Sequence, residues 1–126
     1  MDLAQKRLAG TIIVSPSGRI DHATAEAFKT ALAPHVARCA AGQDRLVLDF
    51  GEVEYISSAG LRILMLAAKQ AKAQGGVLAV AALQPIVREI FEISRFTVVF
   101  DVFPSTREAF ARVSPGALAA FDAARA

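Results

Sequence analysis

The chain opens with short runs of alternating and continuous apolar residues, and this pattern predicts two strands. The first run covers residues 3–8 and the second covers residues 11–15, with Gly10 between them at the turn. Pro16-Ser17-Gly18 follows and indicates a turn or a bulge, because proline and glycine interrupt regular strand pairing. We expect the two strands to pair as a hairpin.

The pattern then changes to a helical repeat over residues 24–39. Apolar side chains recur there every three or four positions, at Phe28, Leu32, Val36 and Cys39. Asp21 lies where a helix cap is expected. Pro34 removes a backbone donor within the repeat, so we expect the helix to kink there or to break into two pieces.

From Leu46 onward, strand-like apolar runs alternate with helical repeats. The predicted elements are a strand over 46–50, a helix from Ser57 or Ser58 to about Gln74, a strand over 77–83, a helix over 84–96 with Pro85 in its first turn and Ile86, Ile90 and Ile93 on one face, a strand over 98–102, and a helix from Ser105 or Thr106 through Val113. This order requires right-handed crossovers and parallel pairing. The sequence therefore predicts an α/β fold with a mixed, mostly parallel sheet of about five strands and about four helices.

The composition is that of one globular domain. The chain has 126 residues, of which 54% are hydrophobic and 21% are charged, so it is expected to fold by core burial. We expect this domain to span residues 1–113. Residues 114–126 are rich in alanine and form either a short helix or a frayed tail, to which we assign no function.

Several features predict a cytoplasmic protein. Cys39 is the only cysteine, so it has no partner for an internal disulfide. The first residues lack the apolar stretch of a signal peptide, and no segment reaches the roughly 18 apolar residues of a membrane span. The net charge is +2 and the basic residues are scattered among acidic ones, so we expect no nucleic-acid partner.

Few groups in the sequence are suited to an active site. There is no glycine-rich phosphate loop, no dinucleotide-binding glycine pattern and no cysteine or histidine cluster at metal-ligand spacing. His22 and His35 are isolated, and Cys39 falls on an apolar stripe. Asp21 and Asp49 lie near strand ends, where each either caps a turn or binds a ligand. We therefore expect neither an enzyme nor a bound metal or cofactor.

The most informative segment is the polar loop that joins the strand over 46–50 to the next helix. That helix opens with Ser57-Ser58-Ala59-Gly60. A serine at the cap accepts a hydrogen bond from a free backbone N–H, and this role explains one of the two serines. Small residues at a helix start also leave N–H groups that accommodate a phosphate, so phosphorylation is the alternative explanation. The residues alone leave both explanations open.

Helical geometry assigns the other positions of this helix to faces. The buried stripe is expected at Leu61, Leu64, Met65, Ala68 and Ala71. Ser58, Arg62 and Lys69 lie to one side of the stripe, with Ile63, Leu66 and Gln70 beyond them. Apolar residues on this outer face are consistent with a partner surface, or with a helix set deeper into its own core.

Two runs, Leu46-Val47-Leu48-Asp49-Phe50 and Ile56-Ser57-Ser58-Ala59-Gly60-Leu61, resemble the signature of STAS domains, in particular that of bacterial anti-sigma factor antagonists. Segments 18–21, 99–103 and 105–109 add to the resemblance, which covers roughly residues 8–112. The resemblance implies the STAS fold.

The resemblance also implies a mechanism and partners. In that family, an unphosphorylated antagonist binds an anti-sigma factor that is also a serine kinase, and the sigma factor is released. The kinase phosphorylates the antagonist with Mg-ATP, and a PP2C-type phosphatase removes the phosphate, so nucleotide and metal belong to the partners. The resemblance implies Ser58 as the phosphorylated residue. Together with the helix face beside Ser58 and the strand end at Asp21, it leads us to expect a partner-binding surface made of Asp21, Ser57, Ser58, Ala59, Gly60, Arg62 and Leu66.

The chain departs from the family's best-known motif, Asp-Ser-Ser-Gly-Leu, at two positions. Ser57 stands in place of the aspartate and Ala59 in place of the second serine, which makes Ser57 an alternative acceptor. Other STAS proteins are subunits of transporter-associated or multi-STAS signalling complexes, and this is the alternative function. A small α/β enzyme or a nucleotide-binding protein is a third. We expect a monomer, although sheet edges and an apolar helix face would also support a dimer.

Overall fold

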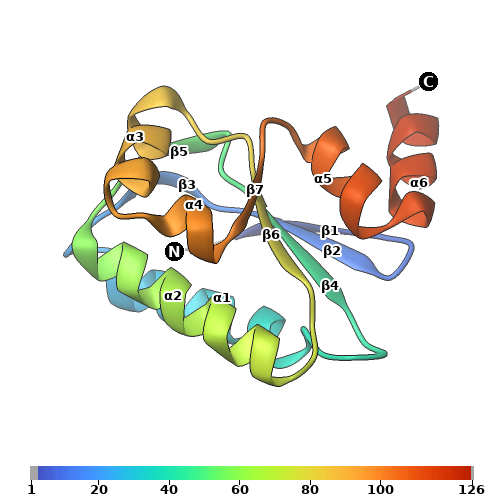
Figure 1. Ribbon diagram of the computed structural model, residues 1–126, viewed down its shortest axis with the longest axis horizontal. Helices are drawn as coiled ribbons and strands as arrows, with labels where there is room; N and C mark the ends of the chain where they lie inside the picture. The colour runs from blue at the N-terminus through green and yellow to red at the C-terminus, as the bar shows by residue number, and fades with distance from the viewer. Residues whose placement is uncertain (1–2, 126) are drawn as a thin grey trace.

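The computed structural model describes residues 3–125, which form strands and helices in alternation (Figure 1). The strands are β1 (Ala4–Leu8), β2 (Thr11–Ser15), β3 (Ser17–Ile20), β4 (Arg45–Asp49), β5 (Glu52–Ile56), β6 (Leu78–Ala81) and β7 (Asp101–Phe103). The helices are α1 (Ala25–Ala37), α2 (Ser58–Ala73), α3 (Pro85–Ile93), α4 (Phe96–Val99), α5 (Thr106–Val113) and α6 (Pro115–Arg125).

The main sheet has five strands in the order β1-β2-β4-β6-β7. β1 pairs antiparallel with β2, and the remaining neighbours pair in parallel. Ala9 and Gly10 both have positive φ at the turn of the β1–β2 hairpin, where a left-handed backbone matches the twist of the strands. The predicted hairpin and the mixed, mostly parallel sheet are confirmed.

Helices cover both faces of this sheet (Figure 1). α1 and α2 lie side by side on one face, and α5 and α6 lie on the other. Successive residues of β4 point to opposite faces, so Leu46 and Leu48 join the core under α1 and α2 whereas Val47 joins the core under α5 and α6. A strand that is buried on both faces in this way appears in the sequence as a continuous run of apolar residues.

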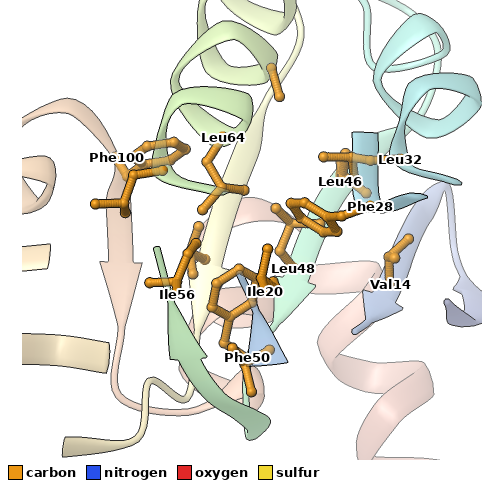
Figure 2. Close-up of a cluster of buried hydrophobic side chains, with 14 of the residues drawn as sticks. Val14, Ile20, Phe28, Leu32, Leu46, Leu48, Phe50, Ile56, Leu64 and Phe100 are labelled. Carbon is orange, nitrogen blue, oxygen red and sulfur yellow. The ribbon is translucent and has the colours of Figure 1, made fainter. Parts of the chain in front are cut away.

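The larger core lies beneath α1 and α2. Figure 2 shows Phe28 and Leu32 of α1 and Leu64 of α2 directed toward the side chains of β4. Ile20 of β3 and Ile56 of β5 enter the same cluster, and both are almost fully buried. The ends of β3 and β5 are therefore fixed by the core at the point where α2 begins.

A second, two-stranded sheet is present where a turn or a bulge was predicted at residues 16–18 and where a polar loop was predicted after β4. β3 and β5 pair in parallel, and the register shifts between Gly18 and Arg19, so the predicted bulge is present within a strand. Val53 and Ile56 are buried whereas the two glutamates of β5 are exposed. This short alternating pattern forms a strand because its apolar residues contact the core.

Helix α1 is one unbroken element, so of the two outcomes predicted at Pro34, a kink or a break into two pieces, the break is wrong. Pro34 is exposed and lies in the last turn of the helix, where the missing N–H removes one intrahelical hydrogen bond. The buried residues Phe28, Leu32 and Val36 hold the helix to the sheet on both sides of the proline.

The segment after β6 also differs from the prediction. α3 ends at Ile93 instead of residue 96, and residues 98 and 99, predicted to start a strand, belong to the short helix α4. The rings of Phe96 and Phe100 pack against Phe91, with centroids 5.8 and 6.2 Å from its ring, and this aromatic cluster bends the chain back onto the core. β7 therefore begins only at Asp101.

Residues 115–125 form helix α6, which is the helical one of the two predicted alternatives. Ala117 is fully buried, and the ring of Phe121 lies 5.2 Å from that of Phe110 in α5. None of the helices within residues 3–125 has the length and apolar character needed to cross a membrane.

Candidate functional site

Helix α2 begins at Ser58, and Ser57 is its N-cap. Ser57 has an extended backbone, and its Oγ accepts a hydrogen bond from the Gly60 N–H at 3.3 Å. The Ser57 carbonyl accepts the first intrahelical bond from Leu61 at 2.9 Å. Of the two residues predicted to open the helix, Ser57 is therefore the cap, and Ser58 has an exposed side chain in the first turn.

Gly60 is buried, and the start of α2 depends on its missing side chain. A Cβ at this position would lie 2.8 Å from Cγ2 of Ile20 and 2.8 Å from Cγ1 of Ile56. These distances are shorter than real Cβ contacts, so only glycine lets the helix approach the ends of β3 and β5 this closely. The small residues at the helix start thus also have a packing role, which the sequence does not reveal.

The end of β3 is tied to the start of α2. The Ser57 N–H donates to the Ile20 carbonyl at 2.8 Å, which places Asp21 next to the two serines. Asp21 Oδ1 accepts hydrogen bonds from the N–H groups of Ala23 and Thr24, at 3.0 and 3.2 Å. The Asp21 carbonyl accepts a further hydrogen bond from the Ala25 N–H at 2.9 Å, whereas Thr24, directly before α1, makes no side-chain cap hydrogen bond. Asp21 therefore caps the turn that leads into α1, in agreement with the predicted cap role.

The Asp21 carboxylate is held in its charged form. Partial burial raises its pKa, but hydrogen bonds from Thr24, Ala23 and Arg19 outweigh burial and leave the pKa below its ordinary value. Arg19 lies 3.5 Å from Asp21 Oδ2, and its guanidinium sits 4.4 Å from the centroid of the Tyr55 ring. Arg19 and Tyr55 were not identified as site residues from the sequence, because their contact depends on the pairing of β3 with β5.

The outer face of α2 carries the other predicted residues. Arg62 and Leu66 are exposed, and Leu66 leaves 52% of its surface open. The buried residues of α2 are Gly60, Leu61, Leu64, Ala67 and Ala71. Met65 and Ala68 are only half-buried, so the predicted stripe is rotated, and Ile63 packs partly against the core.

A groove separates this face from α1. It has a volume of about 430 Å³ and is lined by Ala25, Glu26 and Lys29 of α1 and by Ala59, Arg62 and Leu66 of α2. His22 lies at the same end of the groove. The groove therefore begins at Ala59, the residue after Ser58, and exposes both apolar and basic side chains.

The remaining candidates lie outside this surface. Asp49 Oδ1 accepts a hydrogen bond from the Gly51 N–H at 2.9 Å, which is a turn role. Cys39 is fully buried, its Sγ donates to the Val77 carbonyl at 3.2 Å, and burial raises the pKa of its thiol. Residues 3–125 contain no group of three or more side chains suited to hold a metal ion.

Comparison with known proteins gives consistent results. The family model described as the STAS domain matches residues 3–109. BtrV of Bordetella bronchiseptica, named as a candidate anti-sigma factor antagonist, is 42% identical over 118 residues, which are 94% of this chain and 98% of BtrV.

Solved structures share the fold. An anti-sigma factor antagonist from Mycobacterium paratuberculosis superimposes with a TM-score of 0.78 at 29% identity, over 88% of this chain and 92% of that one. SpoIIAA of Bacillus, solved in its unphosphorylated form, gives a TM-score of 0.70 at 18% identity, over 88% of this chain and 95% of SpoIIAA. The predicted α/β fold class is confirmed.

Proposed function

Since this chain belongs to the STAS domain family, and to the anti-sigma factor antagonists within it, we propose that it releases a sigma factor by binding the anti-sigma factor that holds it. The chain is accordingly a regulatory protein and not an enzyme. Phosphorylation of Ser58 prevents this binding, and dephosphorylation restores it.

The observation that carries the proposal is the division of roles between Ser57 and Ser58. The Ser57 hydroxyl is engaged with the Gly60 N–H, whereas the Ser58 side chain is exposed. A kinase reaches an exposed hydroxyl in the first helical turn without unfolding the helix. A phosphate added there lies where the helix dipole favours negative charge. We therefore propose Ser58, and not Ser57, as the phosphorylated residue.

The switch follows from electrostatics at the partner surface. In the unphosphorylated state, the anti-sigma factor contacts the residues around Ser58, including the exposed Arg62 and Leu66 on α2 and the half-buried Asp21 beside the helix start. A phosphate adds about −1.5 to −2 charges at the centre of this surface. A loss of about 2 to 3 kcal/mol of binding free energy corresponds to a roughly 30- to 150-fold weaker complex.

The partners provide the chemistry that this chain lacks. We propose that the anti-sigma factor is a serine kinase of the histidine-kinase-like ATPase class, which brings Mg-ATP to Ser58. A PP2C-type phosphatase with its own metal ions removes the phosphate. We place all of these proteins in the cytoplasm, where sigma factors act, and we propose that the free antagonist is a monomer.

Affinity pulldown of the tagged protein from its own cell lysate tests these assignments, with mass spectrometry of the partners and of the peptide that contains Ser57 and Ser58. We expect a histidine-kinase-like ATPase together with phosphate on Ser58. The phosphate should be lost in Ser58→Ala and retained in Ser57→Ala. Recovery of transporter or scaffold subunits with an unmodified peptide would instead support a role in a larger STAS assembly.

A further inference from the structure

The groove between α1 and α2 continues beyond the proposed phosphorylation site. Its main part of about 430 Å³ begins beside Ala59, and a smaller hollow of about 90 Å³ extends it between the same two helices as far as Gln70. Both parts share Lys29, Ile63 and Leu66 in their lining. The groove is therefore one elongated feature that follows the seam between the helices.

The floor of the groove is apolar. Ala25 and Ala59 are small, and Ile63 is half-buried between the core and the groove. Leu66 projects into the groove with 52% of its surface exposed. An apolar floor of this kind, open to solvent in the free protein, favours an apolar side chain of a partner.

The two sides of the groove carry positive charge. Lys29 lines it from α1 and Arg62 from α2, and both side chains are exposed. Neither forms an ion pair with any residue in the described part of the chain. Glu26 is the acidic residue in the lining, so two full positive charges oppose one negative charge. Carboxylates of a partner are the complementary groups.

We propose that this groove receives an amphipathic helix of the anti-sigma factor, with an apolar side chain packed on Leu66 and carboxylates opposite Lys29 and Arg62. The proposal rests on the function proposed above, because it specifies how the same partner is bound. A helix in an apolar groove presents its contacts at intervals of three or four residues, which suits a groove that runs along two helices.

The groove also connects partner binding to phosphorylation. Ser58 and Arg62 are four residues apart in α2 and are therefore neighbours on one helix face. A phosphate on Ser58 is within reach of the Arg62 guanidinium, which forms paired hydrogen bonds with phosphate oxygens. Arg62 is then occupied by the phosphate and lost to the partner's carboxylate. Phosphorylation weakens the complex both by adding negative charge and by removing one cation of the groove.

Isothermal titration calorimetry tests the proposal, with the anti-sigma factor recovered in the pulldown as the probe. All variants carry Ser58→Ala so that the kinase does not modify them during the measurement. We expect Lys29→Glu to weaken binding about tenfold or more, and Leu66→Ala to weaken it about fivefold or more. Lys6→Glu is the matched control, because it makes the same charge change on β1 near α5 and α6, and its affinity should stay within about twofold.

The outcomes separate the groove from the proposed function. If the parent Ser58→Ala protein binds the anti-sigma factor and both groove variants bind equally well, the groove proposal is wrong and the proposed function stands. If the parent protein binds no anti-sigma factor, the proposed function fails. Light scattering gives the molar mass of the free protein in parallel. If Leu66→Ala changes this molar mass but leaves the affinity for the anti-sigma factor unchanged, the groove is an interface between two copies of this chain, which also overturns the proposal.

Discussion

Ser57 Oγ lies 3.3 Å from the backbone nitrogen of Gly60 and accepts its hydrogen bond. This bond engages the Ser57 hydroxyl in capping α2, while the adjacent Ser58 keeps an exposed side chain. Two neighbouring serines therefore have separable roles, one in stability and one at the surface.

Single substitutions distinguish these roles. We expect Ser57→Ala to lower the free energy of unfolding by about 1 kcal/mol, because an N–H of α2 loses its capping acceptor. Ser58→Ala should change it by less than about 0.5 kcal/mol, since the Ser58 side chain is exposed. Urea denaturation of both variants provides the measurement, and equal losses would contradict the division of roles.

Gly60→Ala tests the close approach of α2 to β3 and β5. The added Cβ would lie 2.8 Å from side-chain carbons of both Ile20 and Ile56, so the packing must shift. We expect a loss of about 1 to 3 kcal/mol in thermal unfolding, although alanine favours helix more than glycine does. Gly116→Ala is the control, because its Cβ would meet Ala9 at an ordinary 3.5 Å; similar losses in both variants would show that close packing is not the cause.

Ser58→Asp should act as a partial mimic of the phosphorylated state. We expect it to weaken binding to the anti-sigma factor by roughly 30-fold or more, whereas Ser58→Ala keeps the affinity of the wild type. Thr106→Asp is a matched control, because Thr106 is likewise the first residue of its helix, α5, but lies outside the proposed surface. Calorimetric titration measures all three, and an equal effect of the two aspartates would point to a general charge effect instead of a site at Ser58.

We expect the stability of the folded protein to depend on pH through the Asp44 carboxylate. Its carboxylate accepts two hydrogen bonds from the Arg7 guanidinium, the longer of them 3.0 Å. These bonds outweigh burial and, with the positive charges of Arg7 and Arg38, hold the pKa of Asp44 below its ordinary value. Because the folded-state pKa is the lower one, this stabilisation is complete at pH values above about 4 and is lost as the pH falls through the folded-state pKa.

The comparison of wild type with Asp44→Asn measures that contribution. The difference in free energy of unfolding should be largest near neutral pH and should shrink below about pH 4. Urea denaturation at a series of pH values gives this difference directly. A difference that stays constant down to about pH 2 would show that the Asp44 carboxylate makes no ionic contribution.

The elements that the sequence predicts well combine a clear apolar repeat with a local stop or start signal. α5 is an example, because Ser105 precedes the repeat and its side chain accepts a hydrogen bond from the Glu108 N–H at 3.2 Å. At the end of α2, Gly75 adopts the positive φ that its place after the helix suggests. Such signals involve residues close together in the sequence, so they can be recognised without knowledge of the fold.

The features that escape prediction depend on contacts between distant segments. β5 is short and carries two exposed glutamates, and it is a strand only because β3 pairs with it. The Arg19–Tyr55 contact and the buried position of Gly60 arise from the same pairing. The groove exists because α1 packs beside α2, and the apolar repeat of α2 alone does not say which neighbour lies along its flank.

The contribution of helix α6 to stability decides whether the domain ends at residue 113 or at the end of this helix. It lies beyond residues 3–109, which match the family model, yet Ala117 is fully buried and Phe121 packs on Phe110 with ring centroids 5.2 Å apart. Deleting residues 115–126 would expose the apolar surface beneath α6, so we expect the free energy of unfolding to fall by about 2 to 5 kcal/mol in urea denaturation. Phe121→Ala in the full chain should give part of this loss. If the truncated chain is as stable as the full chain, α6 contributes nothing to the fold, and the expected boundary at residue 113 holds; a large loss moves that boundary to the end of α6.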